Sequence, residues 1–366
     1  SVPSGQRPVT KEYRDKVNAT YEQIWDGVWS STVGFGVVES KRNTMDASPE
    51  ERQKAFQEVW EQGNGFRFMF SAFGDITTNK AANEEACKFI RGKIDEVVKY
   101  PRKAAILKPK DLYARRPLCD TGYYEIFNRE NVDVIDLKES PIDQIVPEGI
   151  RTTDGTTHHL DALIFATGFD AIEGNYMRVK ISGRNGKTIQ EHWKNGPKAF
   201  GSIACAGFPN MFIVAGPQGP FANFPPVIES EINFIMSCIE YAEENIVAAQ
   251  VDEPNRAANG TSNGAANGTS SGTSNATANG ALKTNESYAR KGKPTIMEVS
   301  DKAETEWIDL CNRLIEGSLF TTTASWIFGQ NIPGRKPSTN FYFGGLKSYL
   351  DWVKFQTSNG FPGFLG

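Results

Sequence analysis

The sequence lacks the short motifs that mark several common activities. It has no GxGxxG turn, the glycine-rich turn between a strand and a helix at which a dinucleotide phosphate meets helix amides. The nearest approach, Gly34 to Glu39, lacks the third glycine and follows a predicted helix, so we treat it as a chance match. The GxSxG pattern of a nucleophile turn occurs only within the low-complexity residues 252–294, where no strand-to-helix turn is predicted. With a formal net charge of −4 and no block of lysine and arginine, the chain is not expected to bind nucleic acid.

Cysteine and histidine are both scarce. The five cysteines are scattered, odd in number and without a CxxC pair, which favours reduced, buried thiols in a cytoplasmic protein over a disulfide framework. Of the three histidines, His158 and His159 are adjacent and His192 precedes Trp193. None has a partner at the spacing of a metal site or of a nucleophile, so we expect satisfied or surface imidazoles and no metal.

Long apolar runs are missing as well. No stretch approaches the roughly 18 to 20 apolar residues that span a bilayer, and no charged and then apolar leader opens the chain. We therefore expect a soluble protein without a transmembrane segment. The chain begins at Ser1, inside a stretch typical of a loop, and we expect an amino-terminal part to precede it. Its 366 residues are enough for two or three domains.

The first 110 residues do contain helical periodicity. Thr10 is a candidate N-cap for a helix whose apolar residues over 13–28 form one face, which should pack on other helices. A capping box over 48–51 begins a second helix, and Gly63 would end it. A third helix is predicted over 78–100, ended by the proline that follows. This helical module shows no evident chemistry.

Strands are predicted after residue 112. An apolar strand covers 132–137, and a hairpin with a tight Asp-Gly turn covers 150–160. The segment 161–171, DALIFATGFDA, has an unbroken apolar run that is typical of a parallel strand covered on both faces. A further ribbon is predicted over 179–189, and a second buried strand over 211–216.

Three helices are predicted in the carboxy-terminal half. Pro225-Pro226 opens the first, and Ser300 caps the second. The last helix carries apolar residues over 346–353. The apolar face predicted for the first consists of Ile228, Ile232, Ile235, Met236, Ile239 and Ala242.

Two stretches suggest a ligand site. Gly168 ends the apolar run with a residue that lets a ligand approach the backbone, although any buried strand can end this way. Arg115 and Arg116 precede the rigid Pro117 and put permanent charge near the end of the predicted sheet, where open α/β folds bind ligands. A solvated pair of surface arginines would give the same sequence.

Together these stretches resemble the flavin-dependent Baeyer–Villiger monooxygenases, most closely their cyclohexanone monooxygenase branch. The likeness runs almost from end to end and is interrupted once. The matching segments are FRFMFSAFGD (66–75), RRPLCDTGYYEIFNR (115–129), DALIFATGFDA (161–171), GFPNMFIVAGPQGPFANFPPVIES (207–230), SWIFGQNIPG (325–334) and FYFGGLKSY (341–349).

The resemblance implies an enzyme that uses FAD, NADPH and O2 to insert one oxygen atom next to a ketone carbonyl, giving an ester or lactone. It implies that Arg116 is catalytic and stabilises the peroxyflavin and the tetrahedral intermediate, a role suited to a guanidinium, which stays protonated and offers a fixed fork of donors. Arg115 matches a position that more often holds lysine and lies near the NADPH phosphate. Phe221 and Phe224 match walls of the substrate pocket. The implied cofactor-binding residues are Arg115, Gly168, Asn223, Phe224 and Trp326.

Trp326 falls in the family's mobile loop over the nicotinamide cofactor, although a tryptophan there also fits a core anchor. The fold class implied is α/β, a partial flavoprotein fold with two dinucleotide-binding domains and a helical insert domain. The resemblance divides the chain into a helical insert over 1–112, the end of the NADPH-binding domain over 113–168, and the end of the FAD-binding domain over 169–366.

Two alternatives remain open on the sequence alone. One is a related flavin N-hydroxylating monooxygenase, against which the match over 115–129 argues. The other is a non-catalytic fragment, because the family's two glycine-rich turns would lie before Ser1.

Residues 252–294 interrupt the family pattern. They are rich in Asn, Gly, Thr, Ser and Ala, contain the NGTS tetrad twice, and have almost nothing to bury, so they are predicted to be a disordered surface insertion. Four sequons at Asn259, Asn267, Asn275 and Asn285 are read as a chance result of this composition.

Overall fold

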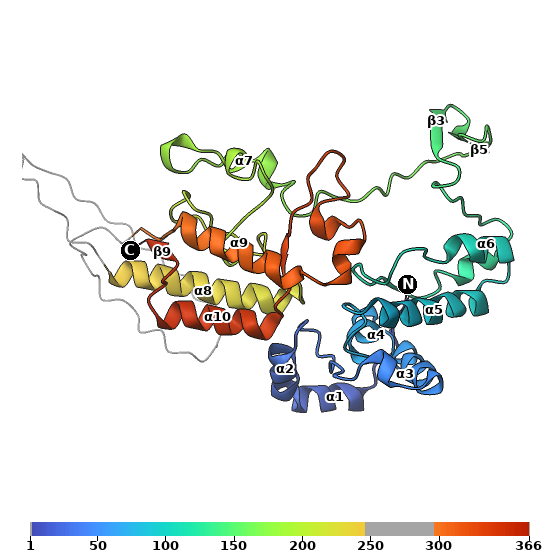
Figure 1. Ribbon diagram of the computed structural model, residues 1–366, viewed down its shortest axis with the longest axis horizontal. Coiled ribbons are helices and arrows are strands. Elements are labelled where there is room, and N and C mark those ends of the chain that lie inside the picture. The colour runs from blue at the N-terminus through green and yellow to red at the C-terminus, as the bar shows by residue number, and fades with distance from the viewer. Residues whose placement is uncertain (1, 246–295, 366) are drawn as a thin grey trace, which may run out of the picture.

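The computed structural model describes residues 2–245 and 296–365. Helices dominate, and they gather in two lobes, with α1 to α6 in one and α8 to α10 in the other (Figure 1). The α-helices are α1 (Lys11–Ala19), α2 (Tyr21–Ser30), α3 (Pro49–Gln62), α4 (Gly65–Ser71), α5 (Lys80–Val97), α6 (Pro101–Leu107), α7 (Ile189–His192), α8 (Phe224–Glu244), α9 (Asp301–Ile315) and α10 (Leu346–Ser358).

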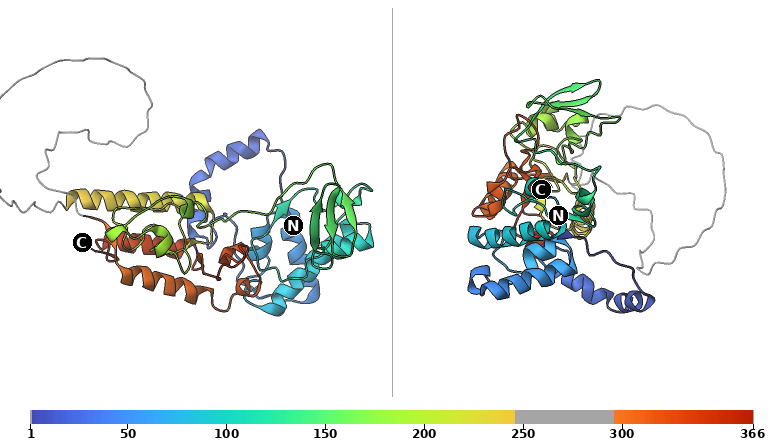
Figure 2. Two further views of the ribbon diagram at one scale, coloured as in Figure 1. Left: turned by 90° about the horizontal axis from the view of Figure 1, so that it is seen from above. Right: turned by 90° about the vertical axis from the view of Figure 1, so that its right-hand side faces the viewer.

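The strands are short and form four separate small sheets within the described residues. Only one sheet has three strands, and it is antiparallel and stands apart from both lobes (Figure 2). It contains the predicted hairpin, whose Gly155 has a φ of 83°, and so confirms that prediction. The paired strands are β1 (Val2–Pro3) with β2 (Cys119–Asp120), β3 (Ile142–Val146) with β4 (Gly149–Thr152) and β5 (Thr157–His159), β6 (Gly219–Pro220) with β8 (Phe341–Tyr342), and β7 (Glu298–Val299) with β9 (Phe364–Leu365).

The predicted capping box is present at the start of α3. The hydroxyl of Ser48 accepts the backbone N–H of Glu51 at 3.2 Å, and the Glu51 carboxylate accepts the N–H of Ser48 at 2.8 Å. Gly63 ends the helix with a φ of 73°, which a side chain would disfavour. Phe56 on its inner face is buried in the core of the first lobe. The predicted second helix is therefore confirmed with both of its ends.

The predicted first helix is two helices, and the predicted packing on other helices holds only for α2, which contacts α10. Thr10 caps α1 as expected, but the helix breaks at Thr20, whose hydroxyl donates to the Lys16 carbonyl at 3.0 Å. Neither α1 nor α2 has a buried residue. Tyr13 and Tyr21 remain more than half exposed, because α1 projects from the lobe instead of lying on another helix (Figure 1).

The predicted third helix is shifted at both ends. Asn79, not Thr78, caps α5 by accepting from the N–H of Ala81 at 3.0 Å. The helix ends at Val97, before the proline that was expected to end it. Pro101 instead begins α6, because the first turn of a helix needs no N–H from that position.

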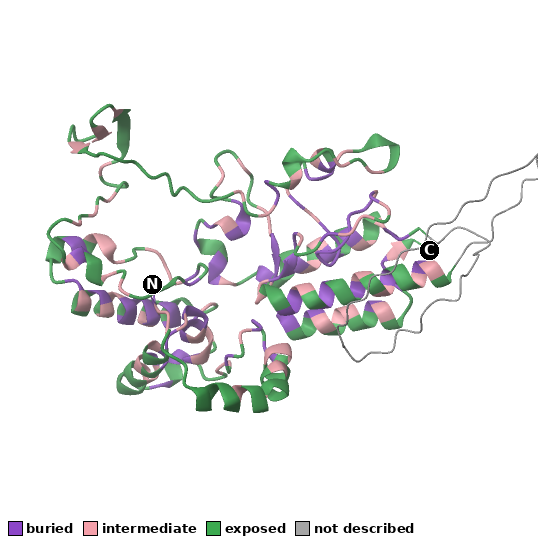
Figure 3. Cartoon of the chain, turned by 180° about the vertical axis from the view of Figure 1, so that it is seen from behind, coloured by how far each residue is buried: buried purple, intermediate pink, exposed green. Residues whose placement is uncertain are grey.

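The strand predicted over 161–171 is absent. No strand lies in this segment, and it is exposed almost throughout, with Ile164 86% and Phe165 70% accessible (Figure 3). A buried parallel strand needs neighbours that pair with it on both sides, and no described strand runs beside this run. The prediction of a buried strand from the apolar composition was therefore wrong.

The other two buried strands were also predicted wrongly. Over 132–137 the Val132 carbonyl accepts from the buried ammonium of Lys103 instead of from a strand. Over 211–216 only a single bridge from Phe212 to Ala204 forms, and Ala215 has a φ of 53°, which a strand does not allow. The ribbon predicted over 179–189 is reduced to one bridge, after which α7 begins.

In the second lobe α8 begins where Pro225-Pro226 predicted, and Ser300 caps α9 by accepting from the N–H of Ala303 at 3.1 Å. The buried face of α8 was predicted wrongly. Val227, Phe234 and Cys238 face inward. Of the predicted face only Ala242 is buried, Ile228 and Ile235 are half-buried, and Ile232, Met236 and Ile239 are exposed. Both faces of α8 are apolar, and α10 packs on the face that carries Phe234 and Cys238.

One aromatic cluster joins the lobes. Met69 of the first lobe packs with Ile315, Phe320, Ile327, Phe328 and Phe341 of the second. Phe221 lies against the same cluster and its ring stacks on Phe343 at 5.1 Å between centroids. We call these residues, together with Trp326 and Phe343, which pack against the same cluster, the aromatic seam.

The remaining sequence predictions have mixed outcomes. The five cysteines are free; four are buried and Cys119 is exposed, which contradicts the expectation for that one. His158 and His159 lie in β5 of the small sheet, and among the described residues neither belongs to a group of possible metal ligands. No described helix is both long and apolar enough to cross a bilayer. The predicted insertion 252–294 and its sequons lie outside the described residues.

Candidate functional site

Arg115, Arg116, Gly168 and Trp326 line one cavity of about 690 Å³. Three segments that are distant in sequence form its walls. The first is the turn before Pro117, the second is the exposed segment that ends near Ala171, and the third is the stretch from Ala324 to Asn331. The structure therefore brings together four of the residues that the sequence singled out.

Arg116 offers an available positive charge in this cavity. Its side chain forms no ion pair within 2–245 or 296–365, and the residue is exposed. The guanidinium carbon lies 6.0 Å from the centre of the Phe66 ring, a cation–π contact that orients the group without neutralising it. Phe66 in turn meets Phe221 edge-on at 6.4 Å, so a ring contact links Arg116 to the loop at 216–224.

Arg115 differs from its neighbour because it has a partner. Its guanidinium donates to the carboxylate of Asp111 at 2.8 Å. Both side chains are more than two fifths exposed, so the pair contributes little to stability and opens easily for another anion. Its predicted contact with a cofactor phosphate stays a prediction.

Gly168 and Trp326 both line the cavity, and each has a distinct structural role. Gly168 has a φ of 91° and a side chain at this position would meet no neighbour, so the backbone conformation rather than crowding requires glycine. The Trp326 ring meets Phe341 edge-on at 5.7 Å and belongs to the aromatic seam. Trp326 thus packs as a core anchor and also lines the cavity, while its predicted place in a mobile loop over the nicotinamide cofactor stays a prediction.

Phe221, Asn223 and Phe224 do not line this cavity. Phe221 packs in the aromatic seam. The side-chain amide of Asn223 donates to the Gly34 carbonyl at 3.0 Å, and its backbone N–H donates to the Val33 carbonyl at 2.8 Å, which ties the loop to the stretch after α2. Phe224 begins α8 and is 46% exposed. Their predicted roles beside a flavin and a substrate are not tested by this geometry.

The loop at 216–224 is held by two buried polar residues that the sequence did not reveal. Gln218 is 1% exposed and forms three side-chain hydrogen bonds, to Ala199 N–H and to the carbonyls of Pro197 and Thr339, at 2.8 to 2.9 Å. Glu231 of α8 accepts the N–H of Ala215 at 2.7 Å. Because Ala215 and Gln218 have φ values of 53° and 60°, these bonds maintain a backbone that side-chain sterics disfavour.

Glu231 makes the stability of the chain depend on pH. It is fully buried, one of its oxygens has no hydrogen-bond partner within the part of the chain that the structure describes, and burial raises its pKa from 4.5 to about 7. Between these values the folded protein keeps a proton that the unfolded chain releases, so stability falls as the pH rises and the loss is complete above 7. From the size of the shift, Glu231→Gln should be more stable than the wild type by about 3 kcal/mol at pH 8 and by almost nothing at pH 4.

Urea unfolding of both proteins at pH 4, 6 and 8 measures this difference. The matched control is Glu229→Gln, which changes an exposed carboxyl on the same helix and should leave the pH profile unchanged. A Glu231→Gln profile parallel to that of the wild type would show that the carboxyl is ionised in both states.

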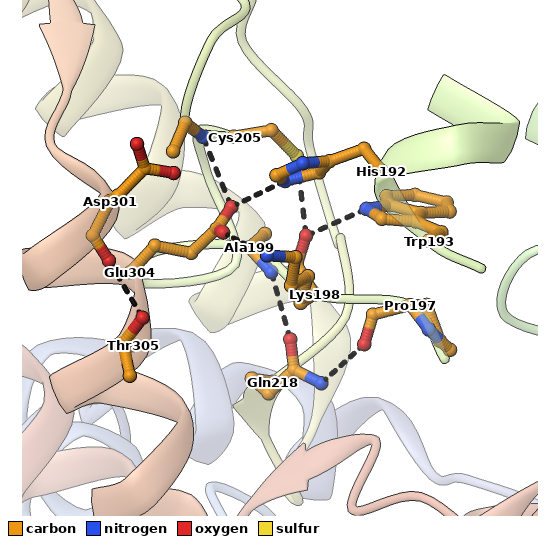
Figure 4. A network of polar contacts seen from close by, with 11 residues as sticks. His192, Trp193, Pro197, Lys198, Ala199, Cys205, Gln218, Asp301, Glu304 and Thr305 are labelled. Atoms are coloured by element: carbon orange, nitrogen blue, oxygen red, sulfur yellow. Dashed lines mark hydrogen bonds and ion pairs between the residues drawn. The ribbon is translucent and has the colours of Figure 1, made fainter. Parts of the chain in front are cut away.

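His192 belongs to a buried network that the sequence did not indicate (Figure 4). Its Nε2 lies 2.8 Å from an oxygen of Glu304, which also accepts the N–H of Ala206 at 3.0 Å. The other oxygen of Glu304 pairs with Lys198 at 2.8 Å. Although burial raises the pKa of Glu304, the hydrogen bond and charge of His192 and the pairing with Lys198 outweigh it and hold that pKa below its ordinary value.

Cys205 lies close enough to this network for His192, Cys205 and Glu304 to be within 4.8 Å of one another. Burial raises the pKa of the Cys205 thiol far above its ordinary range, and the thiol donates to the Lys198 carbonyl at 3.3 Å. Since Glu304 already has three partners, we interpret the group as a structural network at the edge of a second cavity of about 540 Å³. The 112 residues between His192 and Glu304 explain why no local motif predicted it.

Comparison with known proteins identifies relatives over the whole chain. It is 40% identical over 365 residues to a phenazine N-monooxygenase from Lysobacter antibioticus and 39% identical over 364 residues to a cyclohexanone 1,2-monooxygenase from Acinetobacter sp., covering 100% of this chain in each case. A closed crystal structure of cyclohexanone monooxygenase superimposes with a TM-score of 0.85 at 42% identity, over 100% of this chain and 60% of that one. No family model matches.

The chain spans about 59% of the length of these relatives. The structural match gives it the α/β flavoprotein fold of the corresponding part of cyclohexanone monooxygenase. The resemblance found in the six sequence segments is therefore confirmed by relatives that match from end to end. On this evidence the chain matches, from end to end, about three fifths of a Baeyer–Villiger monooxygenase of the cyclohexanone monooxygenase type.

Proposed function

We propose that the protein containing this chain is an FAD- and NADPH-dependent monooxygenase that inserts one oxygen atom of O2 next to a ketone carbonyl. The product is an ester or, from a cyclic ketone, a lactone. The observation that carries the proposal is Arg116, whose unpaired guanidinium faces the same cavity as Gly168 and Trp326 in a chain related to cyclohexanone monooxygenases.

The residues of the cavity fit parts of both cofactors. Arg115 is a cation suited to a phosphate of NADPH, and Trp326 offers a flat ring and an indole N–H at the cavity wall. The rigidly held loop at 216–224, with its glycines and prolines, suits the approach of a flavin ring. No glycine-rich turn for a cofactor phosphate occurs in the 366 residues, so the fit concerns the reactive ends of the cofactors.

When bound, the reduced flavin supplies the activated oxygen, and NADPH supplies the electrons. The contribution of this chain is electrostatic. Attack on a ketone carbonyl puts negative charge on oxygen, and the Arg116 guanidinium stays protonated throughout and offers several donors to that charge. Trp326 and the segment around Gly168 would exclude water from the same cavity.

Product analysis tests this function. The full-length protein is supplied with FAD, NADPH, O2 and cyclohexanone, and the expected result is ε-caprolactone, formed with consumption of one NADPH per lactone and detected by gas chromatography with mass spectrometry. Phenazine is the matched alternative substrate, because one relative is a phenazine N-monooxygenase. Formation of an N-oxide from phenazine, with no ester or lactone from a panel of cyclic and linear ketones, would refute the proposal.

A further inference from the structure

Two walls of the cavity at Arg116 are joined by a cluster of ionic contacts. Arg335 donates to both carboxylate oxygens of Asp170, at 2.8 and 2.7 Å, and it also pairs with Glu173 at 2.7 Å. Beside them the Asn331 side-chain amide donates to the Phe169 carbonyl at 3.1 Å. We call the three charged residues, Asp170, Glu173 and Arg335, the clasp.

The clasp connects segments that otherwise belong to different parts of the chain. Asp170 and Glu173 follow Gly168 and Phe169, and Arg335 lies in the loop 325–340 that also carries Trp326. More than 160 residues separate Asp170 from Arg335. Because Phe169 and Asn331 both line the cavity, opening the clasp would let its two walls separate.

The backbone around Gly329 leaves room for the Arg335 side chain. Gly329 has a φ of 70°, and a side chain at this position would come within 2.9 Å of the Arg335 side chain, so glycine leaves room for it. The loop is closed on itself at both ends, since Gln330 N–H donates to the Ser325 carbonyl at 3.1 Å and Ser338 N–H donates to the Phe328 carbonyl at 3.2 Å. The loop is therefore a folded unit, anchored in the core by Ile327 and Phe328, and Arg335 and Asn331 attach its tip to the opposite wall.

The clasp contains two acidic side chains and one basic side chain, and this arrangement favours retention of Arg335. Two carboxylates face one guanidinium, and the three side chains are only 7% to 25% exposed. The hydrogen bond of Arg335 lowers the pKa of Asp170, which is therefore ionised, whereas burial raises the pKa of Glu173. Without the guanidinium two carboxyl groups would be left close together with little solvent, which favours separation of the walls.

We propose that Arg335 is a positioning residue whose pairing with Asp170 and Glu173 holds the loop 325–340, with Trp326, against the segment at 168–174. The proposal concerns contacts within this chain. Its consequence for the reaction, tighter retention of the nicotinamide cofactor in the cavity, rests on the proposed function. A bidentate, charge-assisted pair of this kind is strong enough to change the fraction of time that the loop is open by about ten- to a hundredfold.

Hydrogen exchange followed by mass spectrometry tests the clasp on the 366-residue chain without any cofactor. In Arg335→Gln the hydrogen-bonded amides of peptides covering 325–340 should exchange about tenfold faster or more, while peptides from α9 and α10 stay unchanged. Lys336→Gln is the matched control, because it removes the same charge from the adjacent, exposed residue. Asp170→Asn tests the partner from the other wall and should give the same change.

The Arg335→Lys variant distinguishes the contribution of the forked guanidinium geometry from that of the positive charge alone. It keeps the charge but loses the fork, so partial protection is expected between the wild type and Arg335→Gln. The clasp would be overturned if peptides covering 325–340 exchanged at the same rate in Arg335→Gln, Asp170→Asn and the control Lys336→Gln. Circular dichroism identifies any variant that has unfolded, and the comparison of exchange rates then uses the variants that remain folded.

The second measurement uses the full-length protein and its kinetics. In Arg335→Gln the KM for NADPH should rise about tenfold or more, with a smaller change in kcat, because the cofactor is held less and the reacting groups are intact. An unchanged KM together with faster exchange would refute the consequence for the cofactor and leave the clasp standing. If no NADPH-dependent oxidation occurs at all, the proposed function fails, and the exchange result still reports on the clasp.

Discussion

Replacement of Arg116 by alanine is expected to lower kcat/KM for ketone oxidation by the full-length protein by about a hundred- to a thousandfold. This is the usual cost of removing one preorganised donor to a developing oxyanion, and the loss here includes a full charge. The folded state should hardly change, because Arg116 is exposed and its described contact is with the face of the Phe66 ring. The measurement is steady-state lactone formation, with thermal unfolding of the same preparations as a check.

Two variants make the interpretation specific. Arg116→Lys keeps a charge without the planar fork and should recover only part of the rate. Arg115→Ala is the matched control, since it removes the neighbouring guanidinium from the same cavity wall, and we expect it to raise the KM for NADPH rather than to lower kcat. Activity of Arg116→Ala within about threefold of the wild type would show that the guanidinium does not stabilise the reacting oxygen.

Replacement of Glu304 by alanine should destabilise the chain by about 3 to 5 kcal/mol, the usual range when one partner of a buried ionic network is removed. Glu304 is 1% exposed, and it serves His192, Lys198 and the Ala206 N–H at once. Its loss leaves the Ala206 N–H and Nε2 of His192 buried without the partner that each has in the wild type. Urea unfolding at pH 7 measures the free-energy difference.

Glu306→Ala provides the comparison for this prediction. It makes the same change two residues further along α9, where Glu306 is exposed and lies 3.8 Å from Lys302. We expect a difference from the wild type below about 0.5 kcal/mol for this variant. Equal unfolding free energies for the two alanine variants would mean that the network at His192 contributes nothing to stability.

Local signals in the sequence predicted those helix ends that have a capping residue or a terminal glycine, such as the two ends of α3 and the start of α9. The bonds that cap a helix join residues two or three positions apart, so Ser48 with Glu51, Ser300 with Ala303 and the positive φ of Gly63 follow from the sequence alone. The same holds for the tight turn at Gly155. These predictions needed no knowledge of distant parts of the chain.

Predictions that depended on distant partners failed where the partner was unknown. Strand formation at 161–171 requires neighbouring strands, and in their absence Ile164 and Phe165 are exposed. The choice between the two apolar faces of α8 depended on where α10 lies, which periodicity does not report.

The candidate site was predicted in part. Arg116, Gly168 and Trp326 were singled out through a resemblance that carries long-range information, and they do share a cavity. Gln218 and Arg335 carry no motif, because each acts through a contact with a residue that is distant in the sequence. Glu231 carries none either, although Ala215 is only 16 positions away. Buried polar residues with partners more than a hundred positions away are the part of such a site that a single sequence leaves unassigned.

The aromatic seam has a consequence for protein engineering. Rings of both lobes interlock there, with Phe66 of the helical lobe edge-on to Phe221, and Met69 packed among phenylalanines that follow residue 314. Shape matching between such rings is specific, and an unmatched ring leaves a void or a clash. A chimaera that exchanges the helical lobe between family members must therefore transfer the rings on both sides together, and one that does not should melt at a lower temperature than either parent.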